Sequence, residues 1–343
     1  NMPVFEGPGD KQVWIYGSLT LIAGMEWNVL GEVHFRAFQT GKAITSAGQQ
    51  FKGYVVFDGV GGEWSLLDDF YSFNHIYLNS GTLRTNSQNI DCYNFLSSNN
   101  STRGLYLGNS TVKMVGQFSF GYTTSNLIFD AGTSHLIFLT SSSQFYGADQ
   151  NFYKVTFEAT PYVNTNYLFN ANVLDKLTLG NYIMVNPYGG FNNYFHEAEF
   201  LQNADILGNN TFDMVTLSPG KVYKLGSGNT QYITTNGTLN AVGNCSNFIA
   251  IFSTIPGQTS AISKPSGNLN LSKVALKDNI ATGGATFTAV SSVDIANNAG
   301  WIFASPSARN LYWIDGAGNW DDTGHWSLSS GGTGGECIPT PFD

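Results

Sequence analysis

Residues 35–53 read FRAFQTGKAITSAGQQFKG, and they lie without gaps over residues 129–147, which read FDAGTSHLIFLTSSSQFYG. Matching positions include phenylalanine, alanine, a Gln-Phe pair and the closing glycine. The offset between the two stretches (129 − 35 = 94) corresponds to about four coils, if one coil takes about 20 to 25 residues as solenoid repeats commonly do. A gapless internal match of this kind predicts stacked turns of one architecture.

Short apolar segments with β-branched and aromatic residues recur between Gly, Asn and Ser corners, and no segment keeps a helical period of 3.6 residues. Examples are Val13–Tyr16, Leu19–Ile22, Val33–Phe35, Tyr54–Phe57, His75–Leu78 and Gly104–Leu107. We therefore expect an all-β chain, a right-handed parallel β-helix whose Asn and Ser corners hydrogen-bond between coils. The alternative is a tandem array of β-sandwich domains, which needs hairpins with two-residue turns that this sequence rarely offers.

Alternating apolar pairs are the candidate core of this solenoid, because every second strand residue points to the same side. The pairs are Ile76 and Leu78, Leu105 and Leu107, Val155 and Phe157, Leu177 and Leu179, Val215 and Leu217, Ile249 and Ile251, and Phe287 with Val290.

Composition narrows the functional classes. Charged residues make up 11% of the chain, well below the roughly 25% of an ordinary domain, while 42% of the residues are hydrophobic and 14% aromatic. The net charge of −9 argues against a nucleic-acid partner, whose phosphates would be repelled. No apolar run reaches the ~18 residues that span a bilayer, so we do not expect a membrane-embedded protein.

Three cysteines occur, at positions 92, 245 and 337, and they show neither a disulfide framework nor a metal-binding pair. A bridge between Cys92 and Cys245 is one interpretation. Buried free thiols are the interpretation that we favour, because cysteine packs as a small apolar residue.

The C-terminal part of the chain is rich in aromatic residues and glycine. Its aromatic residues are Tyr312, Trp313, Trp320 and Trp326. We interpret residues 1–305 as a β-helical repeat unit, 306–332 as a Trp/Gly-rich junction and 333–343 as the start of the next repeat. The aromatic residues are expected to form an apolar plug that seals the end of a coil stack; stacking on sugar rings is the alternative.

The junction pattern YWIDGAGNWDDTGHWSLSSGG, residues 312–332, resembles the junctions between repeats of the SprB-type gliding-motility adhesins, a family of giant secreted surface proteins of Bacteroidota. Three further stretches resemble the body of that repeat: VVFDGVGGEWSL (55–66), LSPGKVYKLGSG (217–228), and VALKDNIATGGATFTA (274–289), which closes on NNAGW (297–301).

The resemblance implies a non-catalytic structural and adhesive repeat of a very large extracellular filament or adhesin. It also implies export by type IX secretion, a place on the cell surface in gliding motility or attachment, and neighbouring repeats of the same chain as partners. Surface polysaccharide is the expected external ligand.

A polysaccharide-binding or polysaccharide-cleaving β-helix protein is the alternative function. Glu197 and Glu199 alternate in the segment FHEAEF, so their side chains would share one strand face roughly 7 Å apart, while His196 would face the opposite side. A solvated strand face is the interpretation that we favour, because no third functional group is evident nearby. Motifs for zinc peptidases, serine hydrolases and phosphate-binding loops are absent, so we expect no enzyme.

Calcium is the one cofactor that the sequence brings into question. Asp315, Asn319, Asp321 and Asp322 place hard oxygen ligands close together in a glycine-rich loop. We favour the interpretation that these side chains cap turns through hydrogen bonds to the backbone.

Overall fold

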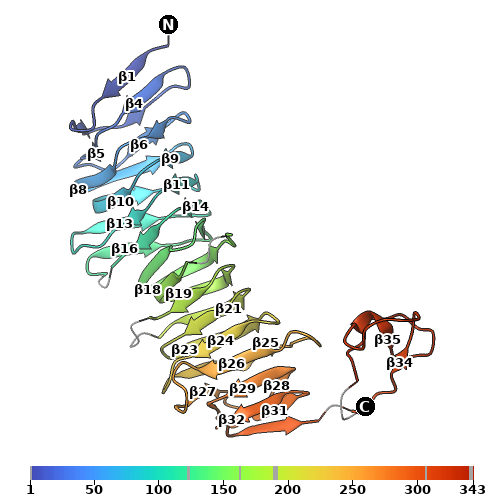
Figure 1. The fold of residues 1–343 in the computed structure, drawn as a ribbon. Helices are drawn as coiled ribbons and strands as arrows, with labels where there is room; N and C mark the ends of the chain where they lie inside the picture. The colour runs from blue at the N-terminus through green and yellow to red at the C-terminus, as the bar shows by residue number, and fades with distance from the viewer. Residues whose placement is uncertain (1, 122–123, 162–163, 188–191, 306, 340–342) are drawn as a thin grey trace. The chain divides into compact units, whose positions relative to one another are not determined.

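A computed structural model describes residues 2–121, 124–161, 164–187, 192–305, 307–339 and 343 of the chain (Figure 1). The protein is all-β and forms a parallel β-solenoid of about 14 turns. This confirms the parallel β-helical architecture and excludes the array of β-sandwiches, because the strands of successive turns pair in parallel. The described residues form no helix with the length and hydrophobicity that a bilayer crossing requires.

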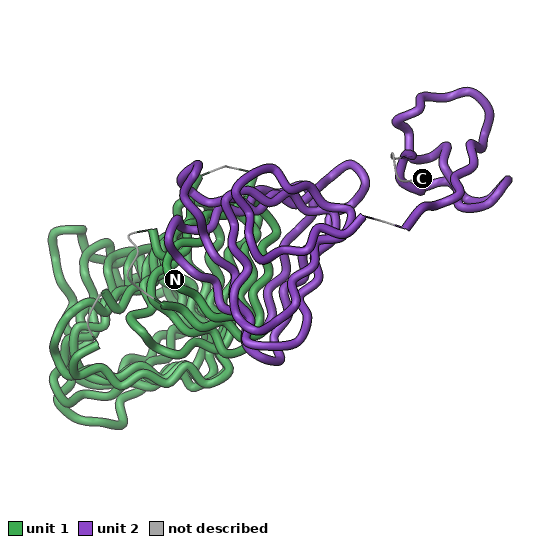
Figure 2. Tube along the Cα trace, turned by 90° about the horizontal axis from the view of Figure 1, so that it is seen from below, with its two compact units in different colours: residues 1–213 green, residues 214–343 purple. Residues whose placement is uncertain are grey.

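Two compact units make up the chain, residues 1–213 and residues 214–343 (Figure 2). Unit 1 contains the strands β1 (Val4–Gly7), β2 (Val13–Ile15), β3 (Leu19–Thr20), β4 (Glu26–Val29), β5 (Val33–Phe35), β6 (Lys42–Thr45), β7 (Gln50–Phe51), β8 (Val55–Leu66), β9 (Phe70–Ser72), β10 (Ile76–Arg84), β11 (Ile90–Cys92), β12 (Phe95–Leu96), β13 (Arg103–Tyr106), β14 (Thr111–Met114), β15 (Gln117–Ser119), β16 (Leu127–Asp130), β17 (His135–Phe138), β18 (Gln144–Phe157), β19 (Asn166–Leu179), β20 (Ile183–Val185), β21 (Tyr194–Phe200) and β22 (Ala204–Ile206).

The division between the units falls within β23 (Asn210–Leu217). Unit 2 continues with β24 (Val222–Leu225), β25 (Thr230–Ala241), β26 (Ile249–Ser253), β27 (Ser260–Ser263), β28 (Asn268–Ser272), β29 (Val274–Lys277), β30 (Asn279–Thr282), β31 (Thr286–Val290), β32 (Val293–Ala296), β33 (Trp301–Ala304), β34 (Tyr312–Trp313), the 3-10 turn η1 (Thr323–His325) and β35 (Trp326–Ser327).

Turn length varies along unit 1. One stack of paired residues runs through successive turns at Val33, Val55, Ile76, Phe95, Phe118 and Phe145. In this stack the turn from Ile76 to Phe95 is the shortest and the turn from Phe118 to Phe145 is the longest. Most of the steps agree with the expected coil of about 20 to 25 residues.

The gapless match between residues 35–53 and 129–147 does not follow this stacking. Phe35 pairs with Phe57, whereas Phe129 pairs with Leu105 in a different stack of strands. Because the turns differ in length, a fixed offset drifts from one stack to the next. The match therefore led to the correct fold, although it aligns residues that do not occupy equivalent places in their turns.

The core consists of the inward side of most solenoid strands; β1, β2 and β32, for example, contribute no buried residue. All but one of the residues in the proposed alternating pairs are buried; Val290 is only partly so. Aromatic rings stack between turns, with centroid distances of 4.9 Å for Phe35 and Phe57 and 4.5 Å for Phe138 and Phe157. Each such stack contributes about 0.5 to 1.5 kcal/mol beyond the burial of area.

Polar corners connect the turns as expected. Asp68 accepts hydrogen bonds from the backbone amides of Ser46 and Ala47, and Asp69 accepts one from the amide of Asn89 at 2.7 Å. Asn89 in turn accepts a bond from the amide of Thr111 at 2.9 Å. These side chains satisfy backbone donors that the bent corners leave without strand partners.

A disulfide in unit 2 joins Cys245 to Cys337, with a Cα–Cα distance of 5.1 Å and a sequence separation of 92 residues. Cys92 is a buried free thiol. The interpretation that Cys92 is bridged to Cys245 is therefore wrong. The interpretation that the cysteines are free thiols is correct only for Cys92.

Arg309 binds residues near the C-terminus, within unit 2. The Arg309 guanidinium donates to both Asp343 carboxylate oxygens, at 2.8 and 2.7 Å, and to the carbonyls of Cys337 and Ile338. Within the expected junction (306–332) and next repeat (333–343), residues 306 and 340–342 lie outside the described residues.

Candidate ligand-binding faces

Glu197 and Glu199 do share one outward face, as the alternation of β21 predicts. Lys176 on β19 lies opposite Glu197, and its Nζ is 2.8 Å from Glu197 Oε1 and 2.8 Å from Glu199 Oε2. We call these three residues the lysine–glutamate cluster. The expectation that no third functional group lies nearby is therefore wrong, because the neighbouring turn supplies one.

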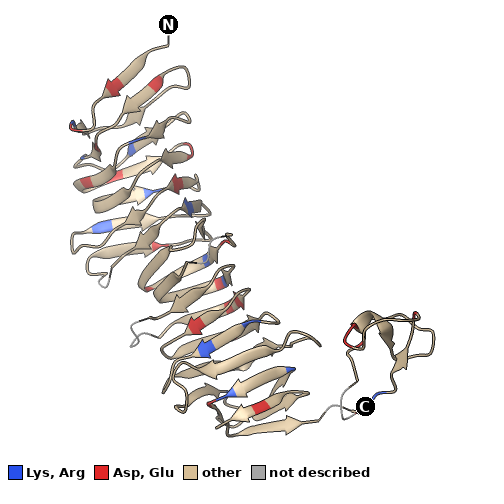
Figure 3. Ribbon diagram, viewed as in Figure 1, with Lys and Arg blue, Asp and Glu red and all other residues tan. Residues whose placement is uncertain are grey.

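The chemistry of the cluster is that of a closed ion-pair network. Hydrogen bonds to Glu197 and then to Glu199 raise the pKa of Lys176 above its ordinary value. The ammonium therefore keeps its proton at neutral pH and is not a base for proton abstraction. Charged residues are few along the solenoid, as the scattered blue and red segments of the ribbon show (Figure 3).

Two further side chains precede Lys176 on the same face, one in each earlier turn. Lys154 pairs with Lys176 in register, and His135 pairs with Lys154. Burial, and secondarily the charge of Lys154, lowers the pKa of His135 below its ordinary value. His135 Nε2 lies 2.9 Å from the hydroxyl of Thr156.

His196 does not occupy the opposite, inward side of β21. Its side chain is 60% exposed and its Nδ1 lies 2.9 Å from Asp213 Oδ2. The pairing of β19 with β21 shifts register between Val173 and Lys176, so that two residues of β19, Leu174 and Asp175, lie opposite His196 alone. At this irregularity His196 and Glu197 both lie outward, between the buried residues Phe195 and Ala198, so simple alternation fails at this point.

The aromatic residues of the C-terminal segment form a small cluster around Trp326, which is 5% exposed. Trp313 and Trp320 meet its ring edge-on, at centroid distances of 5.2 and 4.6 Å, and His325 stacks on Trp313 at 4.7 Å. Tyr312, Trp313 and Trp320 remain 42%, 38% and 60% exposed. The segment thus combines one buried tryptophan with three exposed aromatic surfaces.

The four candidate calcium ligands are exposed. Asp322 caps η1 by accepting a hydrogen bond from the amide of Gly324 at 2.9 Å, which is the capping role that we favoured. Asp315 has a backbone φ of 60°, the left-handed conformation of a tight corner. No group of three or more His, Cys, Asp or Glu that could hold a metal is found among the described residues.

A second face, at the start of unit 1, was not recognised from the sequence. It is built from the outward residues of β2, β5, β8 and β10 and the residues next to them, and we call it the N-terminal face. Its members are Gln12, Trp14, Glu32, His34, Arg36, Tyr54, Asp58, His75 and Tyr77.

His34 is the centre of this face. Its Nε2 lies 2.9 Å from Glu32 Oε2 and its Nδ1 lies 3.1 Å from Asp58 Oδ2. Arg36 Nε lies 3.4 Å from Asp58, and the Arg36 guanidinium lies 4.9 Å from the ring centroid of Trp14. Two carboxylates from successive turns thus hold one imidazole, and an arginine balances part of their charge.

Aromatic rings continue the N-terminal face. Tyr54 stacks on His75 with a centroid distance of 5.0 Å and an interplanar angle of 13°, and Tyr77 meets Tyr54 edge-on. Burial lowers the pKa of His75 below its ordinary value, so at neutral pH the ring is an uncharged stacking partner.

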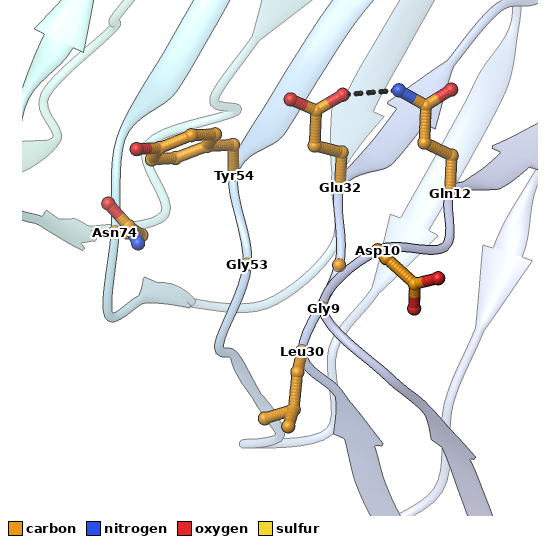
Figure 4. Close-up of a pocket in the computed structure, with 9 residues that line it drawn as sticks. Gly9, Asp10, Gln12, Leu30, Glu32, Gly53, Tyr54 and Asn74 are labelled. Carbon is orange, nitrogen blue, oxygen red and sulfur yellow. Dashed lines mark hydrogen bonds between the residues drawn. The ribbon is translucent and has the colours of Figure 1, made fainter.

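A cleft of about 350 Å³ lies beside these aromatic rings and includes Tyr54 in its wall (Figure 4). It is lined by Gly9, Asp10, Gln12, Leu30, Gly31, Glu32, Gly53, Tyr54 and Asn74. Gln12 Nε2 donates to Glu32 Oε2 at 2.6 Å, which fixes the carboxylate on the cleft wall.

The sequence contained a signal for this face. The buried pair Val33/Phe35 recurs one turn later as Val55/Phe57, and this recurrence places the residues between and beside the two pairs on one outward surface. The gapless match between residues 35–53 and 129–147 reproduces neither the step from Val33 to Val55 nor the step from Lys176 to Glu197. It therefore did not reveal either face.

Comparison of the chain with family models, curated proteins and solved structures gave no match.

Proposed function

We propose that this chain is a non-catalytic structural and adhesive segment of a large extracellular surface protein, with polysaccharide as its external ligand. The observation that carries the proposal is the position of Lys176 between Glu197 and Glu199, at 2.8 Å from each. A glycosidase needs one carboxylic acid free to donate a proton and one free carboxylate, and here a single ammonium binds both groups.

The Cys245–Cys337 disulfide supports a location outside the cytoplasm, where disulfides form and persist. The low content of charged residues, 11% of the chain, supports contact with uncharged polymers.

The resemblance of residues 312–332 to the junctions of gliding-motility adhesins supports a more specific version of the proposal. In this version the solenoid is right-handed, repeats of one chain dock end to end through the aromatic segment, and type IX secretion exports the protein to the cell surface. Movement along that surface or attachment to a substrate is then the biological role.

A polysaccharide assay tests the proposal. Purified protein is incubated with insoluble polysaccharides, and both co-sedimentation and release of reducing ends or unsaturated uronates are measured. We expect co-sedimentation without release of sugar. Release that is lost in the Glu197→Gln and Glu199→Gln variants would show an enzyme at the lysine–glutamate cluster and would overturn the non-catalytic function.

A further inference from the structure

The cleft beside the N-terminal face has the size and openness of a small-ligand site. Its volume of about 350 Å³ lies at the lower end of the range for such sites, about 300 to 1,000 Å³. It lies wholly within unit 1, between residues of the first turns. A ligand of this size is a single ring with its substituents.

Hydrogen-bonding groups on the cleft wall are left available. Glu32 uses Oε2 to accept from Gln12 and to contact His34, while Oε1 makes no hydrogen bond to the described residues. The Tyr54 hydroxyl and Asn74 Nδ2 likewise have no hydrogen-bond partner in the described part of the chain. One charged acceptor, one hydroxyl and one amide donor therefore surround the same space (Figure 4).

An aromatic platform completes the site. Tyr54 is held by stacking on His75 and by edge contact with Tyr77, so its ring is preorganised rather than free to rotate. Tyrosine presents an apolar ring body and a polar tip, which suits a ligand with one C–H face and several hydroxyls. Sugars have this character.

Charge decides which sugars fit. The N-terminal face contains the carboxylates of Glu32 and Asp58, and Asp10 lines the cleft, against the guanidinium of Arg36 and the ammonium of Lys11 beside Asp10. A carboxylate or sulfate group on the ligand would be repelled by Glu32, whereas a hydroxyl can donate to Glu32 Oε1 in a charge-assisted hydrogen bond.

From these observations we propose that the cleft binds one residue of a neutral, hydroxyl-rich glycan. In this arrangement the sugar ring lies against Tyr54, and its hydroxyls bind Glu32, Asn74 and the Tyr54 hydroxyl. The inference rests on the proposed function and gives the ligand class and the place of contact. His34 contacts the same Glu32 carboxylate but does not line the cleft, so it is no part of the sugar contact.

Isothermal titration calorimetry with defined oligosaccharides tests the proposal. The panel contains neutral oligosaccharides of glucan, mannan, galactan and xylan, with oligogalacturonate as the anionic member. We expect saturable binding of at least one neutral oligosaccharide and at least tenfold weaker binding of oligogalacturonate.

Two variants locate the site. Glu32→Gln and Tyr54→Leu should each weaken binding about tenfold or more, as the loss of a charge-assisted hydrogen bond or a stacking platform does. Glu63→Gln is the matched control. Glu63 lies farther along β8, forms an ion pair with Arg84 of β10 and does not line the cleft. Unchanged circular dichroism and melting temperature exclude unfolding. Tyr54→Phe, which keeps the ring and loses one neutral hydrogen bond, should weaken binding less than Tyr54→Leu does.

Each outcome separates the two proposals. Co-sedimentation with polysaccharide that is unaffected by Glu32→Gln and Tyr54→Leu would refute the cleft and leave the adhesive function standing. Hydrolysis that is lost in Glu32→Gln would support the cleft as a sugar site and overturn the non-catalytic function. The absence of binding to every neutral oligosaccharide would refute the cleft proposal, and loss of co-sedimentation as well would refute both.

Discussion

Lys176 on β19 and Glu197 on β21 lie directly opposite each other in adjacent parallel strands, although they belong to successive turns of the solenoid, and their Nζ and Oε1 atoms are 2.8 Å apart. The solenoid thus creates charged pairs between turns that the linear sequence does not display. Their energetic weight depends on exposure, which is 31% for Lys176 and 36% for Glu197.

Substitution Lys176→Met should destabilise the protein, because two carboxylates lose their shared cation. The loss should be about 1 kcal/mol or less, because solvent screens a partly exposed ion pair. Urea denaturation measures this change. Lys11→Met is the matched control, since the Lys11–Asp10 pair is 70% exposed on both sides and should contribute nothing measurable. Equal effects of the two substitutions would contradict the structural role of the cluster.

Cys92 should be inert towards thiol reagents in the native protein. Its side chain is buried, and burial raises the pKa of the thiol far above its ordinary value, so the reactive thiolate is scarce at neutral pH. A colorimetric thiol assay should detect no free thiol in the native protein and one in guanidinium chloride. Rapid native labelling of Cys92 would show that this part of the core opens easily.

Asn210→Ala should destabilise unit 1 by about 2 to 6 kcal/mol, because the substitution leaves two buried amides without this acceptor, each costing about 1 to 3 kcal/mol. Asn210 Oδ1 accepts hydrogen bonds from Asn193 Nδ2 at 2.7 Å and from Asn186 Nδ2 at 3.1 Å, and all three side chains are buried. Thermal and urea unfolding measure the change. Asn109→Ala, at an exposed position, is the control and should be nearly neutral.

Stability should fall as the pH decreases through the ordinary histidine range near about 6.5. Burial lowers the folded-state pKa values of His75 and His135, so the folded protein binds fewer protons at these sites than the unfolded chain does. Stability therefore rises with pH across this window and is lost on acidification. Melting temperatures measured on either side of this range give the slope, which His75→Phe and His135→Asn should each reduce. A slope that neither substitution changes would assign the effect to other groups.

Reduction of the Cys245–Cys337 disulfide should loosen the C-terminal segment. In the chain-entropy model, a bridge that closes a loop of this length stabilises by about 4 to 5 kcal/mol, and strain lowers the observed value. Limited proteolysis should therefore cut near Arg309 faster under reducing conditions and in Cys245→Ser. Cys92→Ser is the control, because its thiol takes no part in the bridge. Identical digestion of all samples would show that noncovalent contacts suffice.

The local features of the fold were predictable from the sequence because they depend on near neighbours. Strand alternation placed Leu105 and Leu107 in the core, and both are fully buried. The polar corners followed from the same reasoning, since Asn89 accepts a hydrogen bond from the backbone amide of Thr111 in the next turn.

Register between turns was not predictable in the same way. The length of each turn is set by its corners and differs from one turn to the next, so a single gapless offset cannot represent it. For this reason His34 and Asp58 were not brought together, although each lay in or beside a recognised strand. The Cys245–Cys337 bridge was out of reach for a similar reason, because it joins a loop between two strands to a segment beyond the last solenoid strand.

The same bridge defines how the protein carries mechanical tension. When the chain is pulled from both sides of Cys245 and Cys337, the force passes through the sulfur–sulfur bond and bypasses residues 246–336. Those residues, which include β26 to β35, are therefore outside the path of the force while the bridge is intact. Reduction would expose these residues to the pulling force. Their unfolding would then add about 300 Å of contour length, at roughly 3.3 to 3.6 Å per residue. The oxidised segment therefore spans only the 5.1 Å between the Cα atoms of the two cysteines, whereas the reduced one can extend.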